Sequence, residues 1–271
     1  MARIKPFLKW AGGKRWFVYN HSNRFPEKYN RYIEPFLGSG AVFFHLNPDN
    51  ALLGDSNPEL IFTYQAIKDN WELVYRYLRE HHQKHSREYY YKIRSFQPNS
   101  IYTRAARFIY LNRTCWNGLY RVNRQGVFNV PIGTKSSVIF EDDQFDQISA
   151  VLQGALLVAS DFEQLIDVAR DDDFIFVDPP YTVRHNHNAF IKYNETLFSW
   201  SDQIRLFQAL SRARDRGAII VGTNAYHSSV RDLYEGEFSI MCVSRNSPIS
   251  SKASTRNNFD ELVFFTEIEN G

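Results

Sequence analysis

The stretch FIFVDPPYTV, residues 174–183, places a carboxylate, two prolines and a tyrosine directly after four apolar residues. Proline has no N–H, so Pro179 and Pro180 stiffen the backbone after Asp178 and leave the nearby carbonyls without a competing donor. The Asp178 carboxylate and the Pro179 carbonyl therefore form a pair of hydrogen-bond acceptors, which suits an amino group with two protons to donate. Tyr181 adds a flat surface on which a ring can stack.

The amino group of a purine or pyrimidine is a poor nucleophile because its lone pair is delocalised into the ring. Two acceptors on its hydrogens would pull the nitrogen toward tetrahedral geometry and localise that lone pair. Such preorganised acceptors typically contribute a few kcal/mol each to catalysis. We therefore predict that Asp178, Pro179 and Tyr181 are catalytic, and that a ring amino group attacks an electrophile held nearby. A rigid turn with a surface tyrosine is the alternative interpretation.

A second stretch, EPFLGSG at 34–40, predicts a strand, a glycine turn and the start of a helix. Gly38 and Gly40 would let the backbone approach a nucleotide-like ligand closely. A carboxylate roughly 20 residues further on, at the tip of a second strand, can hold ribose hydroxyls, and Asp55 occupies that place. An ordinary strand-to-helix turn is the alternative, but Glu34 and Asp55 together favour a nucleotide-type site.

The elements that must position these residues are buried strands. Continuous apolar runs predict strands covered on both faces, as in a parallel sheet flanked by helices. These runs occupy 32–40, 51–55, 155–162, 174–181, 218–224 and 261–268. Helical patterns at 161–170 and 201–216 lie between them, and Gly217 is expected to end the second. The fold class predicted is α/β, and open α/β sheets bind ligands at the carboxyl ends of their strands.

The stretch between Asp55 and Ala155 lacks this strand pattern and predicts a different unit, built from helices rich in aromatic residues. Its last part, 118–131, has two β-like arms around Gly126, which predicts a β-hairpin. The polar run at 244–258 predicts a long loop.

The histidines do not predict a metal site. His81, His82 and His85 lie on a polar helical pattern and are expected to face water. His185 and His187 have no carboxylate or cysteine companion nearby, so no metal is expected there.

Composition limits the class of protein further. The 271 residues carry a net charge of only +2, yet six Arg or Lys and no Asp or Glu lie at 100–135, which predicts one basic face. Two cysteines cannot form a disulfide framework, and the chain opens without a long apolar run typical of a signal peptide or membrane span. We therefore expect a soluble protein in a reducing compartment, the cytoplasm, and no membrane partner.

With these motifs placed, the chain resembles the DNA adenine methyltransferase family typified by Dam. The resemblance covers nearly the full length and rests on FLKWAGGK, EPFLGSG, LLGDSNPELI, the NGLYRVN and FNVP segments, SDFE, DPPY and a final DELVFF, in that order. It implies a site-specific DNA adenine methyltransferase with S-adenosyl-L-methionine as methyl donor and S-adenosyl-L-homocysteine as product.

The resemblance also implies an architecture. It predicts a Rossmann-like S-adenosylmethionine-dependent methyltransferase domain, formed by 1–56 and 155–271, with an inserted helical plus β-hairpin DNA-recognition domain at 57–154. Trp10 and Lys14 would line the methionine end of the cofactor, and Asp161 and Phe162 would meet its adenine. The full set of cofactor residues implied is Trp10, Lys14, Glu34, Phe36, Gly38, Gly40, Asp55, Asp161, Phe162 and Asp178.

Double-stranded DNA is the partner that the resemblance implies. The amino group of a paired adenine is inaccessible, so the base must rotate out of the duplex. A two-stranded ribbon can enter the major groove of the DNA, where Arg commonly reads guanine. Arg121 matches the guanine-reading arginine of the family, Leu119 and Pro131 match positions that contact a thymine methyl group, and Lys9 reaches a base on the 5′ side. These matches favour GATC or a related site.

Further DNA contacts are expected from cations and from the NGLYRVN segment. Arg113, Arg124, Lys252 and Arg256 are candidates for phosphate contacts, with a solvated side chain as the alternative for each. The DNA-binding set is Lys9, Arg113, Asn117, Leu119, Arg121, Arg124, Pro131, Lys252 and Arg256.

Three other functions are weighed against this one. A cytosine-N4 methyltransferase would use the same chemistry, although such enzymes more often carry Ser in place of Asp178. A DNA-binding protein without catalysis conflicts with the intact DPPY stretch, and a dinucleotide oxidoreductase is the alternative at the level of fold. The sequence leaves open whether a restriction endonuclease accompanies the chain; a monomer is adequate for one adenine per event.

Overall fold

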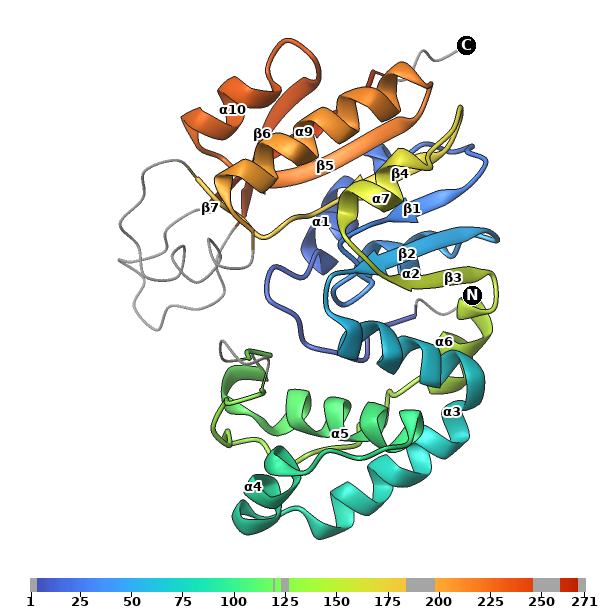
Figure 1. The fold of residues 1–271 in the computed structure, drawn as a ribbon, viewed down its shortest axis with the longest axis vertical. Coiled ribbons are helices and arrows are strands. Elements are labelled where there is room, and N and C mark those ends of the chain that lie inside the picture. The colour runs from blue at the N-terminus through green and yellow to red at the C-terminus, as the bar shows by residue number, and fades with distance from the viewer. Residues whose placement is uncertain (1–3, 119, 123–126, 184–197, 246–258, 268–271) are drawn as a thin grey trace. The chain divides into compact units, whose positions relative to one another are not determined.

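The computed structural model describes residues 4–118, 120–122, 127–183, 198–245 and 259–267 (Figure 1). The chain divides into two compact units, Met1–Ser22 with Leu37–Ser160, and Asn23–Phe36 with Asp161–Gly271. The boundaries of these units differ from those of the two functional domains expected from the sequence, 1–56 with 155–271 and 57–154. The two functional domains stay a prediction.

The first unit contains two parallel strands and most of the helices. Strand β2 (Ala51–Asp55) pairs with β3 (Ala155–Ala159), in a register that aligns Asp55 with Ala159. The helical elements are α1 (Arg15–His21), α2 (Ala41–Leu46), α3 (Pro58–Lys84), α4 (Arg87–Ser95), α5 (Ile101–Thr114), η2 (Trp116–Gly118) and α6 (Phe145–Leu152).

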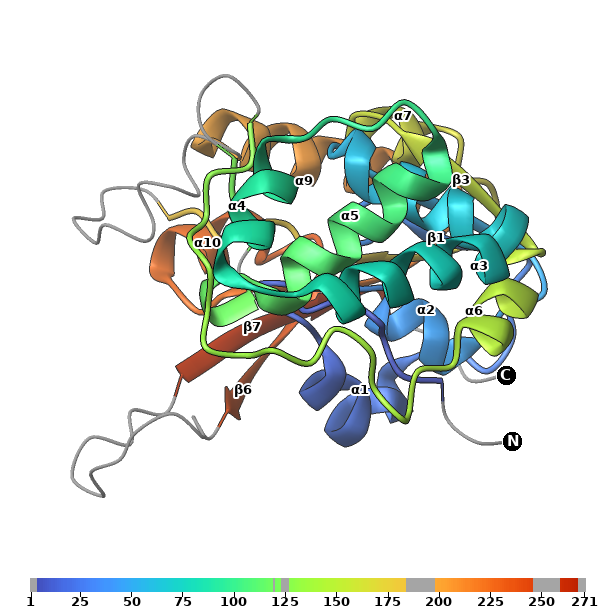
Figure 2. The same cartoon turned by 90° about the horizontal axis from the view of Figure 1, so that it is seen from below.

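Helix α3 organises this unit. It begins at Pro58 because the Asn57 side chain accepts hydrogen bonds from the Glu59 and Leu60 N–H groups, which satisfies donors that have no partner inside the helix. Helices α3 and α5 lie side by side in both views (Figures 1 and 2), and α3 also packs against α6. The apolar face of α3 is thereby buried along most of its length.

The expectation for His81 is wrong. This side chain is mostly buried, its ring stacks on Tyr110 with 4.9 Å between centroids, and Nδ1 lies 2.8 Å from the Tyr89 hydroxyl. Burial lowers the pKa of His81 to about 4, so the ring is neutral at physiological pH. The polar helix pattern did not reveal this contact because both tyrosines come from other helices.

The segment predicted as a β-hairpin has antiparallel pairing in its described part. Isolated bridges join Cys115 to Ile132 and Val122 to Phe128, and the Trp116 N–H donates to the Pro131 carbonyl at 2.9 Å. Its expected turn, including Gly126, lies outside the described residues.

The second unit contains a mixed sheet in the order β1-β4-β5-β7-β6. Strands β1 (Tyr32–Glu34), β4 (Phe174–Val177) and β5 (Ile219–Ala225) are parallel, as the apolar runs predict. Strand β7 (Phe259–Phe265) instead runs antiparallel between β5 and β6 (Ser239–Arg245). Strand β6 was not predicted; its apolar run at 240–243 is partly exposed, unlike the buried run of β4.

Helices α7 (Phe162–Asp167), α9 (Trp200–Asp215) and α10 (Ser228–Tyr234) complete the second unit, with the short η1 (Ser22–Arg24) at the boundary between the units. Helix α7 is shorter than predicted and ends at Asp167; its first turn is capped by Asp161, which accepts from the Glu163 N–H. Helix α9 agrees with its prediction within one residue, and Gly217 follows it with φ 91°, where glycine is favoured. In the part of the chain that is described, no helix is long and apolar enough to cross a membrane.

Candidate active site

The DPPY stretch begins where β4 ends. All four residues of β4 are buried, Asp178 is partly exposed, and Pro179 is buried. The neighbouring strand β5 supplies Thr223, whose hydroxyl donates to Asp178 Oδ1 at 2.8 Å. The strand end therefore fixes the backbone of Asp178, and a buried hydroxyl fixes its carboxylate.

Tyr181 is fixed in a similar way. Its hydroxyl donates to Oε2 of Glu261 on β7 at 2.7 Å. Burial, and then the nearby carboxylates of Asp178 and Glu261, hold the pKa of Tyr181 well above its usual range. The phenol therefore stays protonated and acts as a hydrogen-bond donor.

An aromatic cluster lies in the same unit. The Phe36 and Phe162 rings stack with centroids 5.4 Å apart and planes inclined by 24°, and Phe198 contacts both at 5.7 and 5.6 Å. The guanidinium of Arg205 lies 4.9 Å from the Phe162 ring centroid and donates to Asp161 Oδ1 at 2.8 Å. This arrangement offers a flat apolar surface with a carboxylate beside it. Glu34 is buried and accepts a hydrogen bond from Tyr32 at 2.8 Å.

The first unit contains the glycine turn. Gly38 and Gly40 have φ values of 48° and 66°, a left-handed conformation that favours glycine. A Cβ on Gly38 would lie 2.7 Å from the Trp10 indole, so only a hydrogen fits there. The Gly38 N–H donates to Asp55 Oδ2 at 3.1 Å and the Asn57 N–H to Asp55 Oδ1 at 2.9 Å. The turn thus brings Trp10, Gly38 and Asp55 together.

Each unit by itself offers groups whose chemistry suits part of a nucleoside. Burial raises the pKa of Asp55 to about 6, and the two backbone N–H groups partly oppose that rise. When ionised, a carboxylate at a strand tip is a suitable acceptor for ribose hydroxyls, and stacked aromatic rings suit a purine. Lys14 is buried and donates to the Gly12 carbonyl at 2.9 Å.

The prediction that Arg113 contacts phosphate is wrong for this structure. Its side chain is only 1% exposed. It donates to both carboxylate oxygens of Asp143, at 2.6 and 2.7 Å, and to the carbonyls of Val138 and Phe7. A buried cation needs such partners, so Arg113 ties helix α5 to two distant segments.

Other DNA candidates remain accessible. Asn117, Arg121 and Pro131 are exposed, and Arg121 Nε donates to Asn129 Oδ1 at 3.3 Å. The buried Asn112 side chain accepts from the Lys9 N–H at 2.9 Å and donates to the Lys9 carbonyl at 2.8 Å, which fixes the Lys9 backbone. Leu119, Arg124, Lys252 and Arg256 lie outside the described residues, as do His185 and His187.

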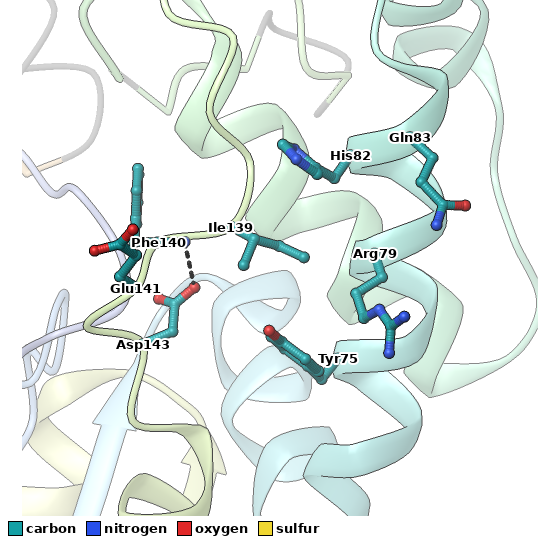
Figure 3. Close-up of a pocket in the computed structure, with 8 residues that line it drawn as sticks. All are labelled: Tyr75, Arg79, His82, Gln83, Ile139, Phe140, Glu141 and Asp143. Carbon is teal, nitrogen blue, oxygen red and sulfur yellow. Dashed lines mark hydrogen bonds between the residues drawn. The ribbon is translucent and has the colours of Figure 1, made fainter.

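A surface pocket of about 400 Å³ lies elsewhere in the first unit (Figure 3). It is lined by Tyr75, Arg79, His82, Gln83, Ile139, Phe140, Glu141 and Asp143. None of the predicted site residues lines it, and its Asp143 carboxylate is already bound to Arg113. Among the described residues, no group of three or more His, Cys, Asp and Glu side chains could hold a metal ion.

Sequence reasoning missed three residues that hold the site, namely Thr223, Glu261 and Arg205. Glu261 had a signal in the sequence, because a carboxylate inside the apolar run DELVFF is costly to bury. Thr223 and Arg205 had no comparable signal, since Asp178 lies 45 residues from Thr223 and Asp161 lies 44 residues from Arg205.

The fold and these side chains define a mixed α/β protein with its candidate reactive carboxylate at the carboxyl end of a parallel strand. The sequence model of D12 class N6 adenine-specific DNA methyltransferases matches residues 10–249. The chain belongs to this family and is an S-adenosylmethionine-dependent, adenine-specific DNA methyltransferase.

Three relatives illustrate the similarity. The chain is 36% identical to Type II methyltransferase M1.LlaDCHI of Lactococcus lactis subsp. cremoris over 96% of this chain and 94% of that protein. It is 33% identical to Type II methyltransferase M.MjaIII of Methanocaldococcus jannaschii, over 93% and 95% respectively. It is also 33% identical to the DNA adenine methylase of Haemophilus influenzae, over 96% and 92%.

Proposed function

We propose that this enzyme methylates N6 of an adenine that has rotated out of double-stranded DNA, within GATC or a related site. Membership of the D12 class supports the reaction and the base. S-adenosyl-L-methionine supplies the methyl group, and S-adenosyl-L-homocysteine is the product.

The observation that carries this proposal is the fixed acceptor at Asp178. Because the Thr223 hydroxyl holds one carboxylate oxygen, the carboxylate keeps its direction as the amino group approaches. The Asp178 carboxylate and the Pro179 carbonyl would then accept the two N–H groups and localise the nitrogen lone pair. Rotating the base out costs a few kcal/mol, and stacking on Tyr181 would offset part of that cost.

We propose that the cofactor contacts groups of matching chemistry. Asp55 would accept hydrogen bonds from the ribose, and Phe162 and Asp161 would bind the adenine ring and its amino group. The other proposed cofactor residues are Trp10, Lys14, Glu34, Phe36, Gly38, Gly40 and Asp178.

DNA recognition is proposed for the hairpin segment and the amino-terminal motif. Arg121 would read a guanine, Pro131 and Leu119 would contact a thymine methyl group, and Lys9 would reach a base on the 5′ side. The proposed set also includes Asn117, Arg124, Lys252 and Arg256. Arg113 is not part of it, because its side chain is buried.

The setting of the reaction is also a proposal. Two of the three relatives bear the names of Type II methyltransferases, which supports a role in restriction-modification beside a cognate endonuclease. We propose that the enzyme acts as a monomer on DNA in the cytoplasm.

Replacement of Asp178 tests the mechanism directly. Asp178→Ala should lower methyl transfer by at least about a hundredfold, because a preorganised electrostatic contact is lost, while DNA affinity changes little. Transfer of labelled methyl groups and DNA binding would be measured on the same preparations. Substantial turnover by Asp178→Ala would remove this residue from the mechanism.

The target base needs a separate measurement. DNA methylated by the wild-type enzyme, digested to nucleosides, should contain N6-methyl-2′-deoxyadenosine and no N4-methyl-2′-deoxycytidine. Mapping of the methylated positions would then test the GATC proposal, since methylation of adenines in unrelated sequences would contradict it.

A further inference from the structure

Glu261 is a buried carboxylate to which the proposed reaction assigns no step. It lies on β7, opposite Ala225 of β5 and Val243 of β6, and is only 6% exposed. An apolar residue would be the ordinary choice on a strand that is paired on both sides. A carboxylate there costs free energy unless hydrogen bonds satisfy it, so its contacts indicate what it does.

A hydrogen bond joins Glu261 to one of the candidate catalytic residues. Oε2 accepts a hydrogen bond from the Tyr181 hydroxyl at 2.7 Å. Asp178, which accepts from Thr223, is also one of the nearby charges that raise the Tyr181 pKa. The hydrogen-bonded pairs Thr223–Asp178 and Tyr181–Glu261 are thus neighbours within one unit.

This connection restricts the Tyr181 ring. A tyrosine that is held only by packing can rotate about its side-chain bonds, whereas a hydroxyl bonded to a fixed carboxylate cannot leave its place without losing that bond. Small displacements of a positioning group lower reaction rates strongly, because the reacting atoms must meet in a narrow range of geometries.

We propose that Glu261 is a positioning residue for methyl transfer, which holds the Tyr181 ring where the extruded adenine stacks with its amino group against Asp178. The inference rests on the proposed function and adds a residue from β7 to it. Glu261 acts through Tyr181, so its effect must disappear once the Tyr181 hydroxyl is absent.

A double-mutant cycle tests that statement. Tyr181→Phe, Glu261→Met and the double variant would be compared by kcat and by KM for S-adenosylmethionine and for duplex DNA. Each single change should lower kcat roughly tenfold, because either change breaks the bond that holds the ring. The double variant should be no slower than the slower single variant, and KM for the cofactor should not change.

Two further variants refine the cycle. Glu261→Gln keeps an acceptor oxygen and should retain kcat within about threefold, since a neutral hydrogen bond is weaker than a charge-assisted one. Glu261→Asp keeps the charge but is one methylene shorter; it should behave like Glu261→Met and replaces it in the cycle if that variant does not fold.

Tyr234→Phe is the matched control. Tyr234 is another buried tyrosine of the same unit, and its hydroxyl binds Gln203 at 2.8 Å. Its loss should reduce stability and leave kcat per folded molecule unchanged.

Losses that multiply in the double variant would overturn the inference, as would an unchanged kcat per folded molecule in Glu261→Met or Glu261→Asp. A wild-type enzyme that methylates no adenine at all would instead refute the proposed function, before any variant is compared.

Discussion

The Asp55 carboxylate ends strand β2, where burial raises its pKa from 3.8 to about 6. For an acid, a raised pKa in the folded state means that folding favours the protonated form. Its stabilising contribution is therefore present below about pH 4 and is lost as the pH rises through 6. In the proposed role, the same carboxylate must be ionised to accept two ribose hydroxyls, and that charge would then be destabilising at the working pH.

Asp55→Asn should remove this pH dependence. Relative to the wild type, the variant should gain up to about 3 kcal/mol in the free energy of unfolding between pH 4 and pH 8. Urea denaturation of both proteins across this range measures the difference, in which the titrations of other groups cancel. A difference that stays constant with pH would show that Asp55 titrates near its ordinary value.

Helices α7 and α9 show how elements position a residue of the proposed cofactor site. Two arginines of α9 reach across to α7. Arg205 binds Asp161 and Glu163 on α7 and Asp202 on its own helix, and its guanidinium lies over the Phe162 ring. Arg212 binds Glu163 and Asp167. Both side chains are similarly exposed, so each ion pair alone should contribute only a small amount to stability.

Arg205→Gln and Arg212→Gln should therefore differ in cofactor binding. Arg205→Gln should raise the KM for S-adenosylmethionine roughly three- to tenfold, because Asp161 and Phe162 lose their common partner. The KM for DNA should stay the same, and Arg212→Gln should leave both values unchanged. Equal effects of the two variants on cofactor KM would show that only the attachment of α9 to α7 matters.

At the scale of the whole molecule, folding reduces the basic face that the sequence predicts. Within the basic segment 100–135, Arg113 is buried against Asp143, Arg104 pairs with Glu59, and Arg107 donates to the carbonyls of Ile93 and Arg94. Arg121 is an exposed arginine of this segment. We therefore expect fewer phosphate contacts than the six cations suggest, and a correspondingly weaker dependence of DNA affinity on salt.

Arg121→Ala should lower the preference for one guanine of the target site by roughly tenfold or more, as expected for the loss of a bidentate base contact. Relative methylation rates on duplexes with single substitutions measure this preference. Arg104→Ala is the control, an arginine of the same segment held in an ion pair, and should leave the preference unchanged. Identical relative rates for Arg121→Ala and the wild type would contradict the proposed role of the hairpin.

The sequence by itself determined the parallel strands β1, β2, β3, β4 and β5, because each begins with a short run of apolar residues, a pattern that depends only on neighbouring residues. The glycine turn at Gly38 and the start of DPPY after a buried strand were visible for the same local reason. These motifs, with their order along the chain, also identified the family correctly.

Only the tertiary structure decided which partners these motifs acquire. Tyr181 and Glu261 are separated by 80 residues, and Arg113 and Asp143 by 30. It also decided that β7 runs antiparallel, since an apolar run is the same in either direction. Contacts between distant residues depend on the packing of the complete chain, so charge and spacing along the sequence could not tell a buried arginine from one that faces DNA.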